Sequence, residues 1–326
     1  MEKARTVAVI GLGSTNMLSA VGDPARGSLE AGQCEPTEPT NLIAQVSAAI
    51  SRVSDHADAP IECVGISAPG LVEEGVIRSF DTPGGEVIER IDLGAAIANM
   101  LDRPVLVQND CTAAALAEWY YGDLGDPGCV VHVTFGTGIG AGIVVDGIPI
   151  EGGSKQAGEV GLLSLDPTRE LSSMGIPGAW EAFCSGRGIP QHARYKLERS
   201  ASPSELRDLD ELSAQSIFAA ASDGDEFASE LLGCIGRYNA AGIGAIANTV
   251  NPDIVTIGGG VALNNRDRLL GDLHRHLSTY CFVDIPDVRI TKLGTEIGLY
   301  GALAGWRAEM TAMTVDPEPV RARTSE

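Results

Sequence analysis

Apolar residues along the chain fall into short runs that predict strands, separated by longer amphipathic stretches that predict helices. Residues 5–10 (RTVAVI) and 17–22 predict two strands joined by a glycine-rich turn, GLGSTN. The same succession returns near residue 130, where CVVHVTF, GTGIGAG and IVVDG predict strand, glycine loop and strand again. The recurrence of this strand–loop–strand motif after about 120 residues of sequence indicates two related halves.

The rest of the pattern predicts an alternation of strands and helices. We expect strands at 61–67, 104–108, 254–260 and 288–293, and helices at 41–53, from residue 110, at 227–247, near 265–277 and at 296–310. This alternation predicts an α/β architecture with a mainly parallel sheet and antiparallel hairpins at its edge. The polar, proline-containing segment 313–326 is predicted to be a disordered tail.

Composition excludes several classes of protein. Of the 326 residues, 44% are hydrophobic and 21% are charged, as in globular chains. A few charged residues lead directly into the first strand, without the apolar core of a signal peptide, so we expect a cytoplasmic protein. The seven cysteines are scattered singly with no CxxC pair, and we expect free, buried thiols.

The net charge of the chain disfavours anionic binding partners. The chain has 23 Lys and Arg against 44 Asp and Glu, which gives a net charge of −21. Such a surface repels nucleic acid and anionic membranes, so neither is an expected partner. Because dissolved salt screens this self-repulsion, an acidic surface with only four lysines favours a halophilic origin.

Three glycine-rich loops that follow predicted strands are candidate sites for nucleotide phosphates. Glycine has no Cβ and tolerates positive φ, so backbone N–H groups can approach an anion closely. None of the loops has the GxxxxGK[ST] spacing of a P-loop or a GxGxxG run followed by a helix. One such loop alone is commonly just a turn, whereas three indicate a nucleotide. The candidate residues are Gly13, Ser14, Thr15, Gly136, Thr137, Gly138, Gly258, Gly259 and Gly260.

Several motifs, in order along the chain, resemble those of the ROK family of sugar kinases. They are GLGSTN, VGISAPGLVEEGVI, VLVQNDCTAAALAEWYYG, VVHVTFGTGIGAGIVVDGIPIEGG, AGEVG, PDIVTIGGGVA and GLYGALAG, and they lie within residues 5–305. The resemblance implies a duplicated actin-like (ribonuclease H-like) ATPase fold, with two domains around a central cleft. It also implies ATP and Mg²⁺ as cofactors, a small-molecule sugar as the phosphate acceptor, and a homodimer.

The resemblance also assigns domains and roles. We expect a smaller domain at 1–109, completed by the helix at 296–310, and a larger one at 110–295. The general base is placed at Asp110, and phosphoryl transfer does need a carboxylate that orients the acceptor hydroxyl. An aspartate that opens a helix can also serve only as its N-cap. Sugar binding is implied for Asn109, Asp110, Glu159 and Glu181, and for Asp81 where the family has asparagine.

Two departures from the family pattern limit what the resemblance implies. The family's zinc ligands are replaced by Leu162, Ser172, Met174 and Ala179. Zinc needs about four nitrogen or sulfur ligands, so we predict no zinc here and a loop held by packing around Met174, Ile176 and Trp180. In the first glycine loop, Gly11 replaces an aspartate that positions the metal and phosphates, and Asn16 replaces a common lysine.

Two hypotheses for function follow. The first is an ATP-dependent, glucokinase-like sugar kinase with Asp110 as its base. The alternative is a catalytically weak or inactive sugar-binding ROK protein, which Gly11 and Asn16 favour and the retained Asp110 disfavours. A ROK transcriptional repressor is disfavoured, because only about four residues precede the first strand and the charge has the wrong sign for DNA.

Overall fold

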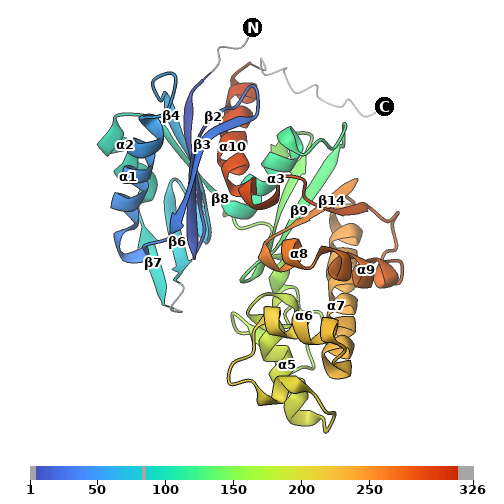
Figure 1. Cartoon of the computed structure of the whole chain (residues 1–326). Helices are drawn as coiled ribbons and strands as arrows, with labels where there is room; N and C mark the ends of the chain where they lie inside the picture. Colours follow the sequence, from blue (N-terminus) through green and yellow to red (C-terminus); the bar gives the residue numbers. More distant parts are fainter. Residues whose placement is uncertain (1–4, 83–85, 315–326) are drawn as a thin grey trace, which may run out of the picture.

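The computed structural model describes residues 5–82 and 86–314, and within these ranges the chain forms two five-stranded sheets. The sheets lie in the two halves of the molecule in Figure 1. The first has the order β3-β2-β1-β4-β8, from β1 (Val7–Leu12), β2 (Asn16–Asp23), β3 (Ser28–Pro36), β4 (Cys63–Ala68) and β8 (Val105–Asn109). The second has the order β11-β10-β9-β14-β15, from β9 (Cys129–Phe135), β10 (Ile139–Val145), β11 (Ile148–Pro149), β14 (Ile254–Gly258) and β15 (Asp287–Ile290).

The two sheets share one topology. In the first, β1, β2 and β3 form an antiparallel meander, and β4 and β8 add in parallel beside β1. In the second, β9, β10 and β11 form the meander, and β14 and β15 add in parallel beside β9. This correspondence confirms the prediction of two related halves.

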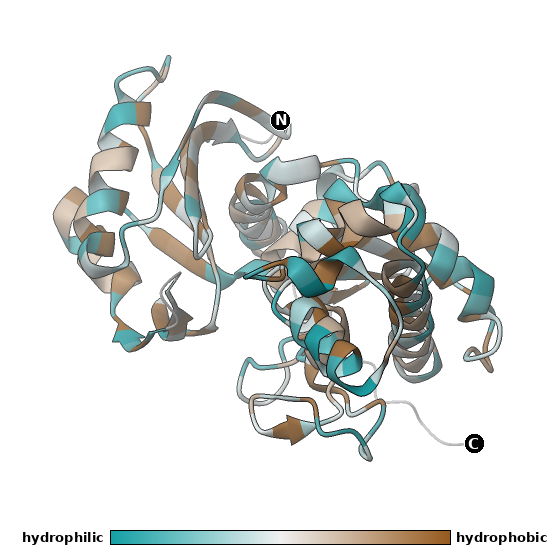
Figure 2. Cartoon of the chain, turned by 60° about the horizontal axis from the view of Figure 1, so that its bottom comes forward, coloured by the Kyte–Doolittle hydropathy of each residue, from teal (hydrophilic) through white to brown (hydrophobic). Residues whose placement is uncertain are grey.

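Helices cover the sheets, and the first sheet shows why β1 is apolar throughout. Ala8 and Ile10 pack against α1 (Leu42–Ser54), whereas Val7 and Val9 on the opposite face pack against α10 (Ile297–Thr314). A strand that is buried on both faces has no polar face to alternate with. In Figure 2 the helices around the sheets change between hydrophilic and hydrophobic colours along their length.

The remaining elements fill the connections between strands. A small sheet of β5 (Leu71–Glu73), β6 (Val76–Asp81) and β7 (Val87–Ile91) lies between β4 and α2 in the sequence. The helices are α2 (Leu93–Leu101), α3 (Asp110–Tyr121), α4 (Glu181–Cys184), α5 (Gly188–Arg199), α6 (Ala214–Asp223), α7 (Glu226–Val250), α8 (Gly260–Asn264) and α9 (Arg266–Leu277). No helix in the described ranges is long and apolar enough to cross a membrane.

Helix α10 ties the C-terminal part of the chain to the first sheet. A Cβ on Gly65 would lie 2.3 Å from the Ala302 carbonyl oxygen, and a Cβ on Gly301 would lie 2.8 Å from the backbone of Ala113 in α3. Glycine at these positions therefore lets α10 pack closely on β4 and α3. The helix runs to Thr314, which corrects the predicted tail at residues 313 and 314, since neither Met313 nor Thr314 is a residue that stops a helix. Residues 315–326 of that tail lie outside the described residues.

Candidate functional site

Asp110 lies at the junction where β8 ends and α3 begins. The N-cap of α3 is Asn109: its Oδ1 accepts hydrogen bonds from the N–H groups of Cys111 (2.9 Å) and Thr112 (3.1 Å). Its Nδ2 donates to the carbonyl of Gly70 (2.9 Å), which precedes β5. Asn109 therefore takes the capping role, so Asp110 is not needed as the cap. The sugar contact expected of Asn109 stays a prediction.

The surroundings of Asp110 favour a carboxyl that titrates close to neutral pH. Its side chain is half-buried, and Oδ1 accepts one hydrogen bond from the Cys111 N–H at 2.9 Å. Removal from water raises the pKa of Asp110 to about 6, although hydrogen bonds from the backbone oppose part of that rise.

Glu159 is brought beside Asp110 by two glycines that flank it. Gly158 has φ +99°, and a Cβ there would lie 1.9 Å from the Ala141 carbonyl oxygen; a Cβ on Gly161 would lie 2.2 Å from that of Ile139. Only glycine lets this segment lie so close to β10. Burial, and then the nearby charges of Glu181 and Asp110, raise the pKa of Glu159. Three of the four carboxyls predicted from the sequence, Asp110, Glu159 and Glu181, are thus close enough to affect one another's charge.

Glu181 opens α4 and is held at both carboxylate oxygens. Its Oε2 accepts a hydrogen bond from the Ile139 N–H at 3.0 Å, and its Oε1 accepts one from the Ser173 hydroxyl. Sequence reasoning missed both donors. Ile139 follows directly after the second glycine loop, which is the one signal that could have found it, whereas nothing in the sequence marks Ser173.

Asp81 ends β6, where it pairs with Val87 in β7. The position of its side chain lies outside what the structure describes, so its contact with the sugar stays a prediction.

The first and second glycine loops occupy the same place in the two halves, at the tip of the hairpin that begins each sheet. Gly13 N–H donates to the Asn16 carbonyl at 2.9 Å, and Gly136 N–H donates to that of Gly138 at 3.0 Å. These bonds close the turns. The N–H groups of Ser14 and Thr15, and of Thr137 and Gly138, make no backbone hydrogen bond within the described part of the chain.

The third glycine loop, Gly258–Gly260, joins β14 to α8 and lies against the second. Gly259 has φ +85°, and a Cβ there would lie 2.4 Å from the carbonyl oxygen of Phe135, the last residue of β9 before the second loop. The fold therefore brings two of the three predicted phosphate loops together at the ends of β9 and β14. Their contact with a nucleotide stays a prediction.

Gly11, in the first-loop segment, has a structural reason to be glycine. It lies within β1, and a Cβ there would lie 3.2 Å from the carbonyl carbon of Gly298 and 3.3 Å from the nitrogen of Leu299. The Cβ of an aspartate would therefore be in tight contact with the first turn of α10, which would have to shift by a few tenths of an ångström.

The four positions that replace the zinc ligands lie in and around a small hairpin, β12 (Ser172–Ser173) with β13 (Ile176–Pro177). Met174 is 72% exposed and has φ +47° in its turn, so the predicted packing around Met174 is wrong. Backbone pairing holds the hairpin. Trp180 is fully buried as predicted; it packs edge-on to Phe135 and donates to Asn239. No cluster of three or more His, Cys, Asp or Glu suited to a metal occurs in the described ranges.

Comparison with known proteins decides the family. The model of the ROK family matches residues 7–309, nearly the whole chain. The chain belongs to the ROK family. This ROK chain is 30% identical over 271 residues to a glucokinase of Halalkalibacterium halodurans, covering 78% of the chain and 79% of that relative.

Solved ROK structures agree in fold. The ROK hexokinase of Thermus thermophilus superposes with a TM-score of 0.78 at 28% identity, covering 94% of this chain and 99% of that one. A ROK glucokinase of Streptomyces griseus, in complex with glucose and AMPPNP, gives a TM-score of 0.73 at 25% identity, covering 92% and 98%. The predicted actin-like ATPase fold in two domains is thereby confirmed.

Proposed function

We propose that this chain, an ATP-dependent sugar kinase, uses Asp110 as the general base that activates the acceptor hydroxyl of its sugar. The observation that carries the proposal is that Asn109, and not Asp110, is the N-cap of α3. Asn109 caps the helix, which leaves the Asp110 carboxylate available beside Glu159 and Glu181. The glucokinase relative and the hexokinase and glucokinase structures support the enzyme class.

The reaction follows from this arrangement. The acceptor oxygen forms a bond to the γ-phosphorus, the bond from that phosphorus to the β–γ bridging oxygen breaks, and ADP leaves. The proton of the hydroxyl passes to the Asp110 carboxylate, whose pKa of about 6 leaves it mainly ionised at neutral pH. Glu159 and Glu181 accept hydrogen bonds from other sugar hydroxyls, and Ser173 and the Ile139 N–H orient Glu181.

The nucleotide would be held by backbone rather than by charged side chains. The N–H groups of Ser14, Thr15, Thr137 and Gly138 are suited to phosphate oxygens, and the third loop lies beside the second. ATP brings Mg²⁺, which neutralises charge on the phosphates. In a chain with Gly11 in place of the family aspartate, the phosphates and water would supply most of the metal ligands. The domain boundaries at 109/110 and 295/296 and the homodimer are part of this proposal.

The second candidate is a sugar-binding ROK protein without efficient catalysis. Its supporting observation is the close contact between Gly11 and α10, because a side chain at this position, such as the aspartate that positions the metal in the family, would require α10 to shift by a few tenths of an ångström.

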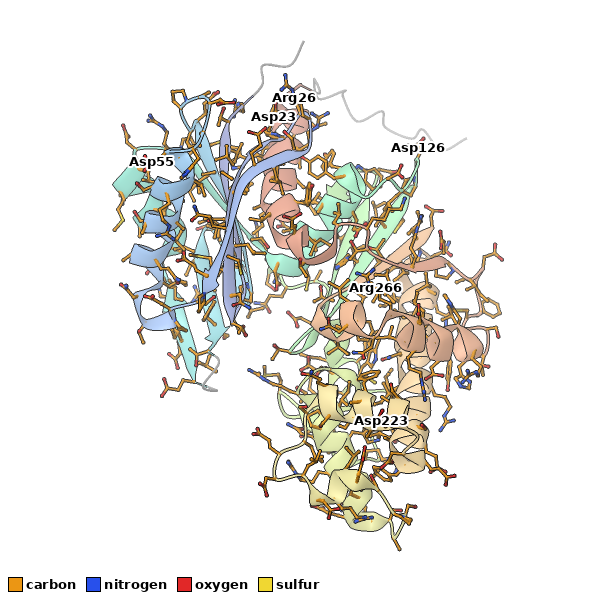
Figure 3. The ribbon with its side chains drawn as sticks, in the orientation of Figure 1. Asp23, Arg26, Asp55, Asp126, Asp223 and Arg266 are labelled. Carbon is orange, nitrogen blue, oxygen red and sulfur yellow. The ribbon has the colours of Figure 1, made fainter. Side chains whose placement is uncertain are left out.

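Replacement of Asp110 by Asn separates the two candidates. Asp110→Asn keeps the shape but removes the base, so turnover of the best sugar in a hexose panel should fall by about 10²- to 10⁴-fold. ATP affinity should stay unchanged, because the loops hold the phosphates. Asp126→Asn is the control, since Asp126 is exposed in the loop before β9 (Figure 3). Equal turnover in wild type and Asp110→Asn would refute the base; sugar binding without turnover in either would establish the second candidate.

A further inference from the structure

A cavity of about 540 Å³ lies in the second half of the molecule, between facing sides of α5 and α7. These helices occupy the lower part of Figure 1. Helix α5 contributes residues 192, 195, 196 and 199, and α7 contributes residues 227, 230, 234, 237, 238 and 241. These spacings place each set on one side of its helix. The volume is in the range of small-molecule sites.

The cavity is cationic in a strongly acidic chain. Four cations line it, Arg169, Lys196, Arg199 and Arg237, against one carboxylate, Glu230. Arg169 and Arg199 are engaged elsewhere, because Asp166 lies 2.9 Å from Arg169 Nε and Glu170 lies 2.7 Å from Arg199 Nη2. Their charge still contributes to the potential of the cavity, although part of it is already neutralised.

Lys196 and Arg237 are different. Neither has a carboxylate within ion-pair distance among the residues that the structure describes. Lys196 Nζ lies 3.1 Å from the sulfur of Cys234, and Arg237 Nη2 lies 3.0 Å from the same atom. Two positive charges are therefore held side by side around one thiol. Like charges at such separations repel one another, and a bound anion between them would remove the repulsion.

The walls of the cavity suit the organic part of a ligand. The rings of Phe183 and Tyr238 stack with centroids 4.4 Å apart, and Arg199 lies over the ring of Tyr195 at 3.8 Å. His192 is only 4% exposed, and its Nδ1 has no hydrogen-bond partner within the described part of the chain. Burial lowers the pKa of His192 to about 4, so the ring is neutral and leaves one polar atom to satisfy.

We propose that this cavity binds a small phosphate ester, with its phosphate between Lys196 and Arg237 and its organic part along the Phe183 and Tyr238 rings. A phosphate monoester carries close to two negative charges, which match the positive charges of Lys196 and Arg237. The arginine guanidinium group can also donate two parallel hydrogen bonds to a pair of phosphate oxygens. The site is distinct from that proposed for the sugar, although α4 contributes Phe183 to one and Glu181 to the other.

Calorimetric titration of the full chain tests the proposal independently of turnover. Glucose 6-phosphate and phosphoenolpyruvate are the probes, with inorganic phosphate and citrate for comparison. Saturating glucose and a non-hydrolysable ATP analogue are present to occupy the proposed sugar and nucleotide sites. We expect at least one of the two esters to bind at one per chain, and more tightly than inorganic phosphate or citrate.

Matched variants locate the binding. Lys196→Gln with Arg237→Gln should weaken the ester about tenfold or more, the cost of a lost charge-assisted bond. Arg266→Gln removes an exposed cation elsewhere, on α9 (Figure 3), so this variant should bind the ester as wild type does. Melting curves without ligand verify folding of every variant. The proposal is overturned if neither ester binds, if citrate binds more tightly, or if the double variant binds equally well.

Discussion

Asp110 and Asn109 show how two adjacent polar residues acquire different tasks. The asparagine carboxamide makes three hydrogen bonds to backbone groups of Cys111, Thr112 and Gly70. The half-buried aspartate accepts a hydrogen bond from the Cys111 N–H and is partly removed from water. Water exclusion disfavours the ionised form, whereas hydrogen bonds to that form favour it, and here the first effect is larger.

The pH dependence of turnover should report this balance. A general base must be ionised, so kcat/KM should fall on the acid side with a midpoint near pH 6, the pKa to which burial raises Asp110. An aspartate in water would place that limb near pH 4. Initial rates between pH 4.5 and pH 8 measure it, with circular dichroism as the control for folding. A midpoint below pH 5 in a folded protein would contradict the assignment.

Glu118 on α3 and His132 on β9 form a buried pair of titratable residues. Both side chains are at most 1% exposed, and His132 Nδ1 lies 3.8 Å from Glu118 Oε1. Burial raises the pKa of Glu118 and lowers that of His132 to about 3. Burial therefore disfavours the charged form of each group, and the His132 ring is neutral at pH 7. His132 Nδ1 also lies 2.9 Å from the Thr256 hydroxyl oxygen.

Glu118→Gln should stabilise the protein at neutral pH. A carboxyl with a raised pKa in the folded state contributes stability that is present at low pH and is lost as pH rises through that pKa, because the unfolded chain releases the proton first. The amide carries no such cost, so we expect a gain on the order of 1 kcal/mol at pH 7 that disappears near pH 4. Calorimetric melting measures it, with exposed Glu211→Gln as control. A gain of equal size at both pH values would show a packing effect instead.

At the scale of elements, the first sheet is covered on one face by a helix from the other end of the chain, α10. It comes last in the chain but covers β1 and β4, and its small residues let it lie directly on backbone. The glycine at position 11 belongs to this contact as much as to the phosphate loop. The departure from the family pattern at this position therefore accompanies close helix packing.

Restoring the family aspartate should accordingly damage the packing. In Gly11→Asp the new side chain meets the backbone of Gly298 and Leu299 at the start of α10, and we expect a loss of about 1–3 kcal/mol of stability, as in other overpacked sites. Asn16→Lys restores the other family residue at an exposed position of the same loop, and should change stability by less than about 0.5 kcal/mol. Denaturant unfolding compares the two. An unchanged midpoint in Gly11→Asp would mean that α10 can shift without cost.

At the scale of the whole molecule, charge dominates. The net charge of −21 lies on a chain whose ion pairs are mostly at exposed positions, such as Arg90 with Asp92 and Lys292 with Asp123. Exposed pairs contribute little each, so they do not offset the general repulsion among 44 acidic residues.

Salt should therefore stabilise the folded chain. Counter-ions screen the repulsion over about 10 Å at 0.1 M and about 3 Å at 1 M, so the melting temperature should rise between low and molar potassium chloride. Differential scanning calorimetry measures the rise, and sucrose at equal osmolality controls for solvent exclusion. A flat or falling curve would remove the halophilic interpretation and leave the fold untouched.

The sequence by itself determined the elements whose causes are local. Strands such as β1 and β14 are buried along their whole length and so appear as mainly apolar runs, and a glycine loop follows each of them directly. The edge strand β3 escaped prediction because its residues are half-buried or exposed, and the register that defines it comes from β2.

Only the tertiary structure decided how distant residues divide their tasks. Which of Asn109 and Asp110 caps α3 depends on the Gly70 carbonyl, 39 residues away from Asn109. Ser173 reaches Glu181 only because a hairpin turns back on α4, and Lys196 and Arg237 share Cys234 only because α5 faces α7. Periodicity and composition record how each segment is buried, whereas hydrogen bonds and charge clusters depend on which segments the fold brings together.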